Sequence, residues 1–140
     1  MTTVMISRRS SRAKQRGFTP LEMVIVVVIV AILASIAYPS YLAQMRKSRR
    51  ASAESHLMDI AAHQQQYLFD SRTYAASLLA LNMTTPADVA AAYTITVTVA
   101  AGPPPSFTIA ATPTGTQVKD LGGAMLTIAD SGAKTPVGAW

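Results

Sequence analysis

The sequence contains no cysteine and few charged residues. The absence of cysteine from all 140 residues excludes disulfide scaffolds, thiolate nucleophiles, and zinc or iron–sulfur sites built on Cys ligands. Only 14% of the residues are charged and 50% are hydrophobic, a composition that argues against intrinsic disorder. A chain of this length is long enough for one domain with one modest core.

The net charge of +5 is confined to the N-terminus. Residues 1–17 carry no acid and five bases, which are Arg8, Arg9, Arg12, Lys14 and Arg16. The remaining seven bases are balanced by seven acids. The overall basicity therefore describes a short leader and does not by itself indicate a basic surface for nucleic acid.

An apolar segment follows this leader directly. Residues 18–38 contain only three clearly polar side chains, those of Thr19, Glu22 and Ser35. About 20 apolar residues suffice to cross a bilayer as a helix, and a helix satisfies its own backbone groups in lipid. We therefore predict a transmembrane helix with the basic leader on the cytoplasmic side and the C-terminus on the other side.

The apolar pattern continues beyond this segment with helical spacing. Apolar side chains recur every three or four residues, and Arg50 and Glu54 are spaced as an i,i+4 ion pair. We predict one long helix over residues 19–70, which is amphipathic over residues 39–70. Pro39 removes one backbone donor and crowds the preceding turn, so we expect a bend or local melting there.

The pattern changes from helix to strand after residue 71. Residues 93–99 alternate strictly between apolar side chains and threonines, which is typical of a half-buried strand. Further strands are predicted at 107–111, 125–129 and 133–135, between turns rich in Gly and Pro. Short connections favour an antiparallel meander. The predicted fold class is α+β: a long N-terminal helix with a small antiparallel sheet head, residues 71–140, packed on its C-terminal half.

The junction between leader and helix carries a recognisable motif. Residues 16–22 run Arg-Gly-Phe-Thr-Pro-Leu-Glu and open the apolar helix directly behind the basic leader. This junction resembles the class III signal peptide of type IV prepilins and pseudopilins. The resemblance implies that the prepilin peptidase removes the leader 1–17 by cutting between Gly17 and Phe18, and that the new amino group of Phe18 is methylated.

The resemblance extends over most of the chain. Residues 37–41, 46–50, 66–74 and 107–113, with Gln117 and Asp120, are similar to PilE-like minor pilins and their ComP-like relatives. The likeness implies the type IV pilin fold for the whole chain.

Two positions depart from the family pattern. Pro20 stands where relatives usually have Leu or Ile, and it is tolerated because the first helical turn has no use for its missing N–H. Relatives commonly carry a cysteine pair around the distal loop, where Gly122 and Ala139 stand here. The head therefore lacks a disulfide-closed loop, which would stabilise the folded state by about 3 kcal/mol.

Glu22 is an acid close to an apolar layer and has two interpretations. In the first, Thr19 and Glu22 form a capping box in which each side chain satisfies a free backbone N–H. In the second, which the resemblance implies, Glu22 pairs with the amino group of Phe18 on a neighbouring subunit during fiber assembly. We favour the assembly role, because a carboxylate in lipid is costly without a partner.

A second basic cluster lies beyond the apolar segment and comprises Arg46, Lys47, Arg49 and Arg50. It weakens the charge argument for orientation slightly, and its bases are of the type that contacts DNA phosphates. Residues 71–140 hold three bases and three acids, however, which predicts no electropositive head. We therefore interpret the cluster as ion pairs within and between helices and keep DNA binding as the less favoured alternative.

Other residues give weaker signals. His56 and His63 are about 10 Å apart along a helix, which is too far to share one metal ion, so we interpret both as part of a polar helix face. Tyr67, Tyr74 and Tyr93 are interpreted as packing residues of the core. The sequence shows no catalytic triad, phosphate-binding loop or paired carboxylates, so we expect no enzyme, no cofactor and no metal site.

The preferred hypothesis is a structural subunit of the type IV pilus, a minor pilin. Its expected partners are other pilin subunits, the prepilin peptidase, the inner-membrane assembly platform and membrane lipid, with DNA as a less favoured partner. The precursor is expected in the bacterial inner membrane with its head in the periplasm, and the processed subunit in the extracellular fiber. Three alternatives stay open: a type II secretion pseudopilin, a ComP-like DNA-uptake pilin, and a secreted protein cleaved after Ala37 that begins at Tyr38.

Overall fold

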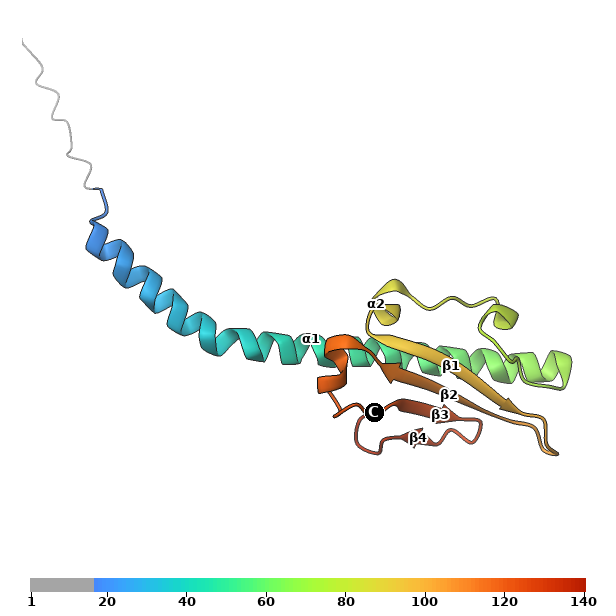
Figure 1. Cartoon of the computed structure of the whole chain (residues 1–140). Helices are drawn as coiled ribbons and strands as arrows, with labels where there is room; N and C mark the ends of the chain where they lie inside the picture. Colours follow the sequence, from blue (N-terminus) through green and yellow to red (C-terminus); the bar gives the residue numbers. More distant parts are fainter. Residues whose placement is uncertain (1–16) are drawn as a thin grey trace, which may run out of the picture. The chain divides into compact units, whose positions relative to one another are not determined.

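A single long helix runs through most of the first half of the chain. The computed structural model describes residues 17–140, so the leader 1–16 and its predicted role lie outside the described residues. The chain divides into two compact units, Met1–Tyr38 and Pro39–Trp140, which we describe separately. Helix α1, Pro20–Ser71, begins in the first unit and continues in the second (Figure 1). The predicted long helix is thus confirmed to within one residue at each end.

The described part of the first unit is fully exposed. Every residue over 17–38 is exposed. By length and composition α1 contains one stretch apolar enough to cross a membrane, and none of that stretch is buried in the protein. The helix continues through Pro39, so the local melting expected at this residue is not found, while the bend stays a prediction.

The second unit contains a four-stranded antiparallel sheet in the order β1-β2-β3-β4. The strands are β1 Tyr93–Ala100, β2 Ser106–Pro113, β3 Leu126–Ala129 and β4 Lys134–Thr135. This order confirms the predicted meander and the α+β fold class. Three short helices that we did not predict lie in the connections: η1 Leu79–Leu81 and α2 Ala87–Ala90 before β1, and η2 Gly115–Lys119 before β3.

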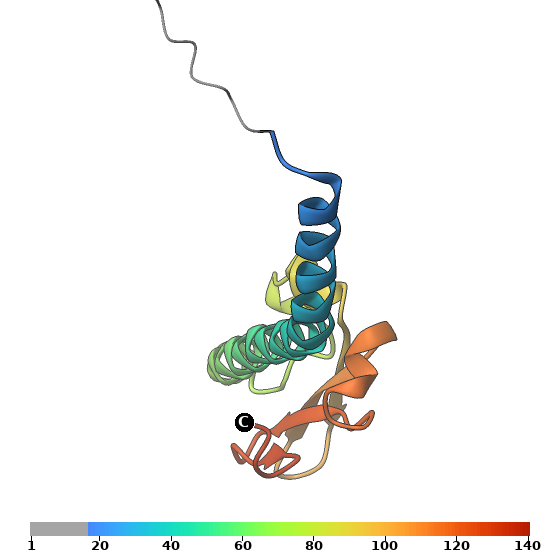
Figure 2. The ribbon, with the colours of Figure 1, turned by 90° about the vertical axis from the view of Figure 1, so that its left-hand side faces the viewer.

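The core of the second unit lies between the sheet and α1. Ala53, Leu57 and Ile60 are 0% exposed and follow one another at the three- and four-residue spacing that keeps them on one helix face. The inward-facing apolar residues of the strands cover this face, and they include Ile109 and Leu126, both 0% exposed. Figure 2 shows the sheet on one side of the second part of α1. The predicted packing of the head on the second part of α1 is therefore confirmed.

Aromatic residues complete the core as predicted. Tyr74 and Tyr93 are buried, and Tyr67 packs against the core while partly exposed. The ring of Tyr74 meets the ring of Phe107 edge to face, with 4.7 Å between the centroids and an interplanar angle of 73°. This contact joins the segment after α1 to the middle of the sheet.

The opposite face of the sheet is polar but uncharged. Strands β1, β2 and β3 contain no charged residue. Their solvent-facing positions are largely threonines, and Thr94 lies opposite Thr112 while Thr98 lies opposite Thr108. The strict alternation along β1 therefore produces one apolar face, buried at Tyr93 and half-buried beyond it, and one exposed threonine-rich face.

Candidate assembly site and candidate anion pocket

The start of α1 is closed by a reciprocal pair of hydrogen bonds. The backbone N–H of Glu22 donates to Oγ1 of Thr19 at 3.2 Å, and the backbone N–H of Thr19 donates to Oε2 of Glu22 at 3.4 Å. Pro20 occupies the first helical position, where its missing N–H costs nothing. The capping box that the sequence predicted is therefore present.

The predicted processing and assembly residues lie together around this cap. Gly17, Phe18, Thr19 and Glu22 line a hollow of about 500 Å³ at the helix start. Phe18 is 73% exposed, and Glu22 is exposed as well. The carboxylate of Glu22 accepts only the long 3.4 Å hydrogen bond from the backbone N–H of Thr19. Most of its acceptor capacity is therefore available to a cationic group. Its exposure and its free acceptor capacity therefore suit Glu22 to bind an amine.

The basic cluster is divided among three environments. Arg50 forms ion pairs with Glu54 at 3.4 Å and with Asp120 at 3.2 Å, which confirms the predicted pair with Glu54. Burial raises the pKa of Glu54 above its ordinary value, and the nearby Arg50 opposes this rise. Lys47 is exposed. The remaining two members, Arg46 and Arg49, are half-buried.

Arg46 and Arg49 line a pocket together with a base from the far end of the chain. The pocket encloses about 250 Å³, and its walls are Leu42, Met45, Arg46 and Arg49 of α1 and Thr116 and Lys119 of η2. Within the described residues, both ion pairs involve Arg50, so the three bases of the pocket have no carboxylate partner there. Counting charges over 71–140 alone missed this local concentration, because Lys119 joins bases that lie in α1.

A buried glutamine fixes the η2 wall of this pocket against α1. Gln117 is 1% exposed, and its Nε2 donates to the carbonyl oxygen of Arg46 and to the hydroxyl of Tyr93, both at 2.9 Å. Burial raises the pKa of this tyrosine hydroxyl, and the bond to Gln117 opposes the rise. Because Asp120 is also held by Arg50, the chain is anchored on both sides of Lys119. We therefore regard the pocket as preformed.

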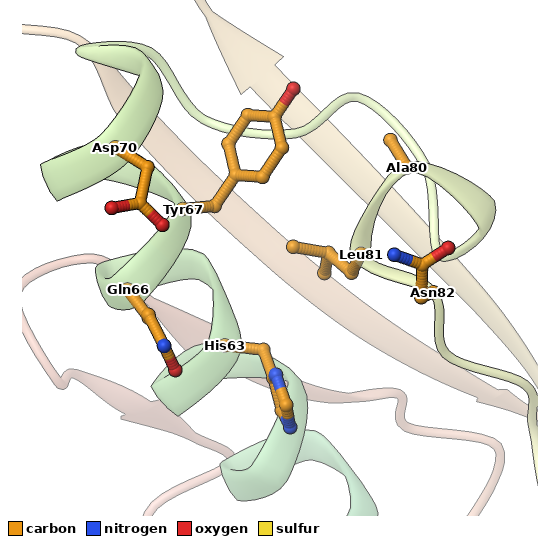
Figure 3. Close-up of a pocket in the computed structure, with 7 residues that line it drawn as sticks. All are labelled: His63, Gln66, Tyr67, Asp70, Ala80, Leu81 and Asn82. Atoms are coloured by element: carbon orange, nitrogen blue, oxygen red, sulfur yellow. The ribbon is translucent and has the colours of Figure 1, made fainter.

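A second pocket lies between the end of α1 and η1. It encloses about 320 Å³, and Figure 3 shows its walls: His63, Gln66, Tyr67 and Asp70 of α1 on one side, and Ala80, Leu81 and Asn82 on the other. The nearby Gln64 is 0% exposed and bonds the backbone of Ala75 twice, at 2.7 and 2.8 Å. This pair of hydrogen bonds holds the segment after α1 in place, and no short-range pattern in the sequence predicts it.

The two histidines differ in a way that the sequence analysis did not predict. His63 is exposed, in agreement with the predicted polar face. His56 is 6% exposed, so its assignment to the polar face is wrong. Burial lowers the pKa of His56, while Asp59 and Asp88 oppose this effect. The position of His56 on the helix face that packs inside the head, four residues before Ile60, explains the difference.

Comparisons with known proteins agree with this geometry. A family model described as "Type IV minor pilin ComP, DNA uptake sequence receptor" matches residues 39–125. A second, the "Prokaryotic N-terminal methylation motif", matches residues 12–38. No curated protein matches the chain. Among solved structures, a type IV pilin from Shewanella oneidensis is 23% identical with a TM-score of 0.55, covering 68% of this chain and 97% of that one, and this likeness shows the fold.

Proposed function

Because this chain belongs to the type IV minor pilin family and is a structural subunit of a pilus, we propose that it is made as a membrane-inserted precursor and then processed. In this proposal the peptide bond between Gly17 and Phe18 is cleaved by the prepilin peptidase on the cytoplasmic side, and the amino group of Phe18 is methylated. The methylation-motif match spans this junction, which supports it over cleavage after Ala37.

The observation that carries the proposal is the exposed carboxylate of Glu22 one turn after Phe18. All side chains around it over 17–38 are exposed, so this part of α1 buries its apolar surface only against lipid or other subunits. Cleavage leaves a positive amino group on Phe18. The carboxylate of Glu22 on one subunit and this amino group on the next neutralise each other when both leave water.

Assembly then exchanges one apolar environment for another. In the membrane the exposed side chains over 18–38 contact lipid, and in the fiber they contact the same segment of neighbouring subunits. Dispersion contacts change little in this transfer, so the charge pair of Glu22 fixes which axial register is stable. The inner-membrane assembly platform is the expected partner for the transfer. As a structural protein, a pilin is not expected to be an enzyme.

Substitution of Glu22 separates the assembly role from the capping role. Glu22→Gln keeps the geometry of the capping box, because a Gln at the third helical position serves the cap as well. We expect Glu22→Gln to be processed normally but to stay in the membrane fraction, with pilus incorporation reduced at least tenfold. Mass spectrometry of the N-terminus and immunoblots of sheared pili measure the two steps.

The matched control for the cap is Thr19→Ala, which removes the hydroxyl acceptor of Glu22 N–H and leaves the carboxylate. It should enter the pilus. Full incorporation of Glu22→Gln would disprove the charge-pair role. Separately, Gly17→Ala should leave an unprocessed precursor, and a mature N-terminus at Phe18 in this variant would contradict the proposed cleavage site.

A second candidate function is DNA binding by the head. The matching family model takes its description from a DNA uptake sequence receptor. The concentration of Arg46, Arg49 and Lys119 at one pocket is the observation that favours it here. A gel shift of short duplexes by the full chain, measured at several salt concentrations, tests this candidate. The logarithm of the binding constant should fall with the logarithm of the salt concentration, with a slope of about one for each phosphate neutralised. The absence of a shift at low salt would remove it.

A further inference from the structure

The pocket of Arg46, Arg49 and Lys119 has features that the assembly proposal leaves unexplained. Arg46 and Arg49, which are half-buried, and Lys119, which is exposed, line the same space of about 250 Å³. Within the described residues no carboxylate is paired with any of the three. Placing three like charges around one space, with two of them partly removed from water, is unfavourable unless an anion binds between them. The pocket therefore indicates an anionic ligand.

The position of the pocket along α1 limits which anion reaches it first. The helical part of the apolar segment, 20–38, is about 29 Å long, which is close to the hydrocarbon thickness of a bilayer. Arg46 follows Tyr38 by eight residues, or about 12 Å of helix. The headgroup layer adds about 5 to 8 Å to each side of the hydrocarbon, and a helical Arg side chain leans toward the N-terminus of its helix.

The residues between the apolar segment and the pocket are typical of a membrane interface. Tyr38 and Tyr41 are 65% and 62% exposed, and tyrosines are enriched at headgroup level. Bases directly after them are the usual second part of an interfacial anchor. Tyr41 belongs to the same unit as the pocket and directly precedes Leu42, which is part of the pocket wall.

The lining of the pocket is amphipathic. Leu42 and Met45 lie beside the bases and are half-buried, and Thr116 supplies a hydroxyl group on the opposite wall. A ligand that carries a phosphate next to apolar methylene groups satisfies both kinds of wall. Duplex DNA presents its phosphates in extended rows, whereas this pocket gathers three bases around one small space.

From these observations we propose that the pocket binds the phosphate of an anionic phospholipid headgroup in the leaflet that faces the head. The phosphate lies among Arg46, Arg49 and Lys119, and the glycerol and upper acyl carbons contact Leu42 and Met45. This inference rests on the proposed membrane-inserted precursor. The contact holds the head at the membrane surface until the helix leaves the bilayer, when the phospholipid stays behind and the three bases become available to another anion.

The experiment uses the full chain, reconstituted in vesicles of equal parts phosphatidylcholine and phosphatidylglycerol. Native mass spectrometry after gentle detergent extraction counts the phosphatidylglycerol and phosphatidylcholine that stay bound to each protein molecule. We expect the wild type to retain phosphatidylglycerol in preference, and Arg49→Gln and Lys119→Gln each to lower the ratio about fivefold. Lys119→Gln is decisive because Lys119 lies far from the basic cluster in sequence.

The matched control is Lys47→Gln, which removes the same charge from the same cluster but does not line the pocket. Its lipid ratio should stay within twofold of the wild type. An equal loss in Lys47→Gln and Arg49→Gln would show diffuse attraction to the surface and overturn the pocket. Circular dichroism of each variant checks that the fold is intact.

The remaining outcomes separate this inference from the proposals on which it rests. A chain that does not enter the vesicles at all contradicts the membrane-inserted precursor. A chain that enters them but retains both lipids equally contradicts only the lipid site. If Arg49→Gln and Lys119→Gln abolish duplex DNA shifts and leave the lipid ratio unchanged, the pocket is a DNA site and the lipid proposal is wrong.

Discussion

Helix α1 consists of two stretches that acquire their stability in opposite ways. Over 20–38 every side chain is exposed, and within residues 17–140 nothing buries the apolar surface of this stretch. Over 39–71 one face is covered by the sheet, with Ala53, Leu57 and Ile60 fully buried. The first stretch depends on whatever surrounds the protein, whether lipid or other subunits, while the second depends on contacts within its own head.

The difference shows that one helix is stabilised by two environments: lipid or other subunits around its first stretch, and the core of the head around its second. In the first stretch the composition matters and the individual apolar residue matters little, because lipid adapts to any apolar shape. In the second stretch individual positions matter, because a packed core does not adapt. The following predictions test this contrast, beginning with the largest expected effect.

Leu57→Ala should lower the free energy of unfolding of the head by about 2 to 5 kcal/mol, because it removes a fully buried side chain and leaves a cavity. Ile29→Ala is the control in the other stretch, where the side chain is 51% exposed, and it should leave this free energy unchanged. Guanidinium unfolding of the full chain in detergent, followed by the fluorescence of the single Trp140, measures both variants. An equal loss of unfolding free energy in both variants would contradict the proposed difference between the two stretches.

Gln64→Leu should lower the free energy of unfolding by about 1 to 3 kcal/mol, since the backbone N–H and C=O of Ala75 lose their partner in a buried place. Gln66→Leu, on an exposed position two residues later, should change it by about 0.5 kcal/mol or less. The same unfolding measurement applies. A neutral Gln64→Leu would show that the polar clamp adds nothing to the packing of this stretch.

The smallest effect concerns pH. Burial lowers the pKa of His56 in the folded head below its ordinary value of 6.5, so the unfolded chain binds more protons near and below that pH. The contribution of His56 to stability is therefore complete above pH 6.5 and is lost as the pH falls. The unfolding free energy of His56→Gln should fall less than that of wild type between about pH 7.5 and about pH 5.5. A slope in His56→Gln that matches the wild-type slope would contradict the prediction.

Much of the fold follows from local pattern alone. The long helix and all four strands were predictable because hydrophobic periodicity reports which face of an element is covered. The cap of Thr19 and Glu22 was also predictable, since both partners lie within one turn. By contrast, η1, α2 and η2 span at most five residues each and lack a periodic signal of their own.

The parts that could not be predicted depend on partners far apart in the chain. Gln117 bonds Arg46 across 71 residues, and Arg50 bonds Asp120 across 70, so the two contacts that place Lys119 at the pocket both join distant parts of the chain. Nothing near Gln117 in the sequence distinguishes this buried glutamine from the exposed Gln66, whereas Gln64 lies four residues after Ile60, on the buried face of α1. Summing charges by segment failed for the same reason, because the electrostatic field at a pocket depends on distance in space.

The threonine-rich face of β1, β2 and β3 has a consequence for how other molecules bind the head. With no charged residue on these strands, the face adds no charge of its own to the field that attracts a molecule from a distance. Ionic strength therefore has little influence on whatever touches it, since there is no charge to screen. Salt weakens contacts on the α1 and η2 side while leaving those on the sheet side intact, so a salt titration distinguishes which side of the head a partner occupies.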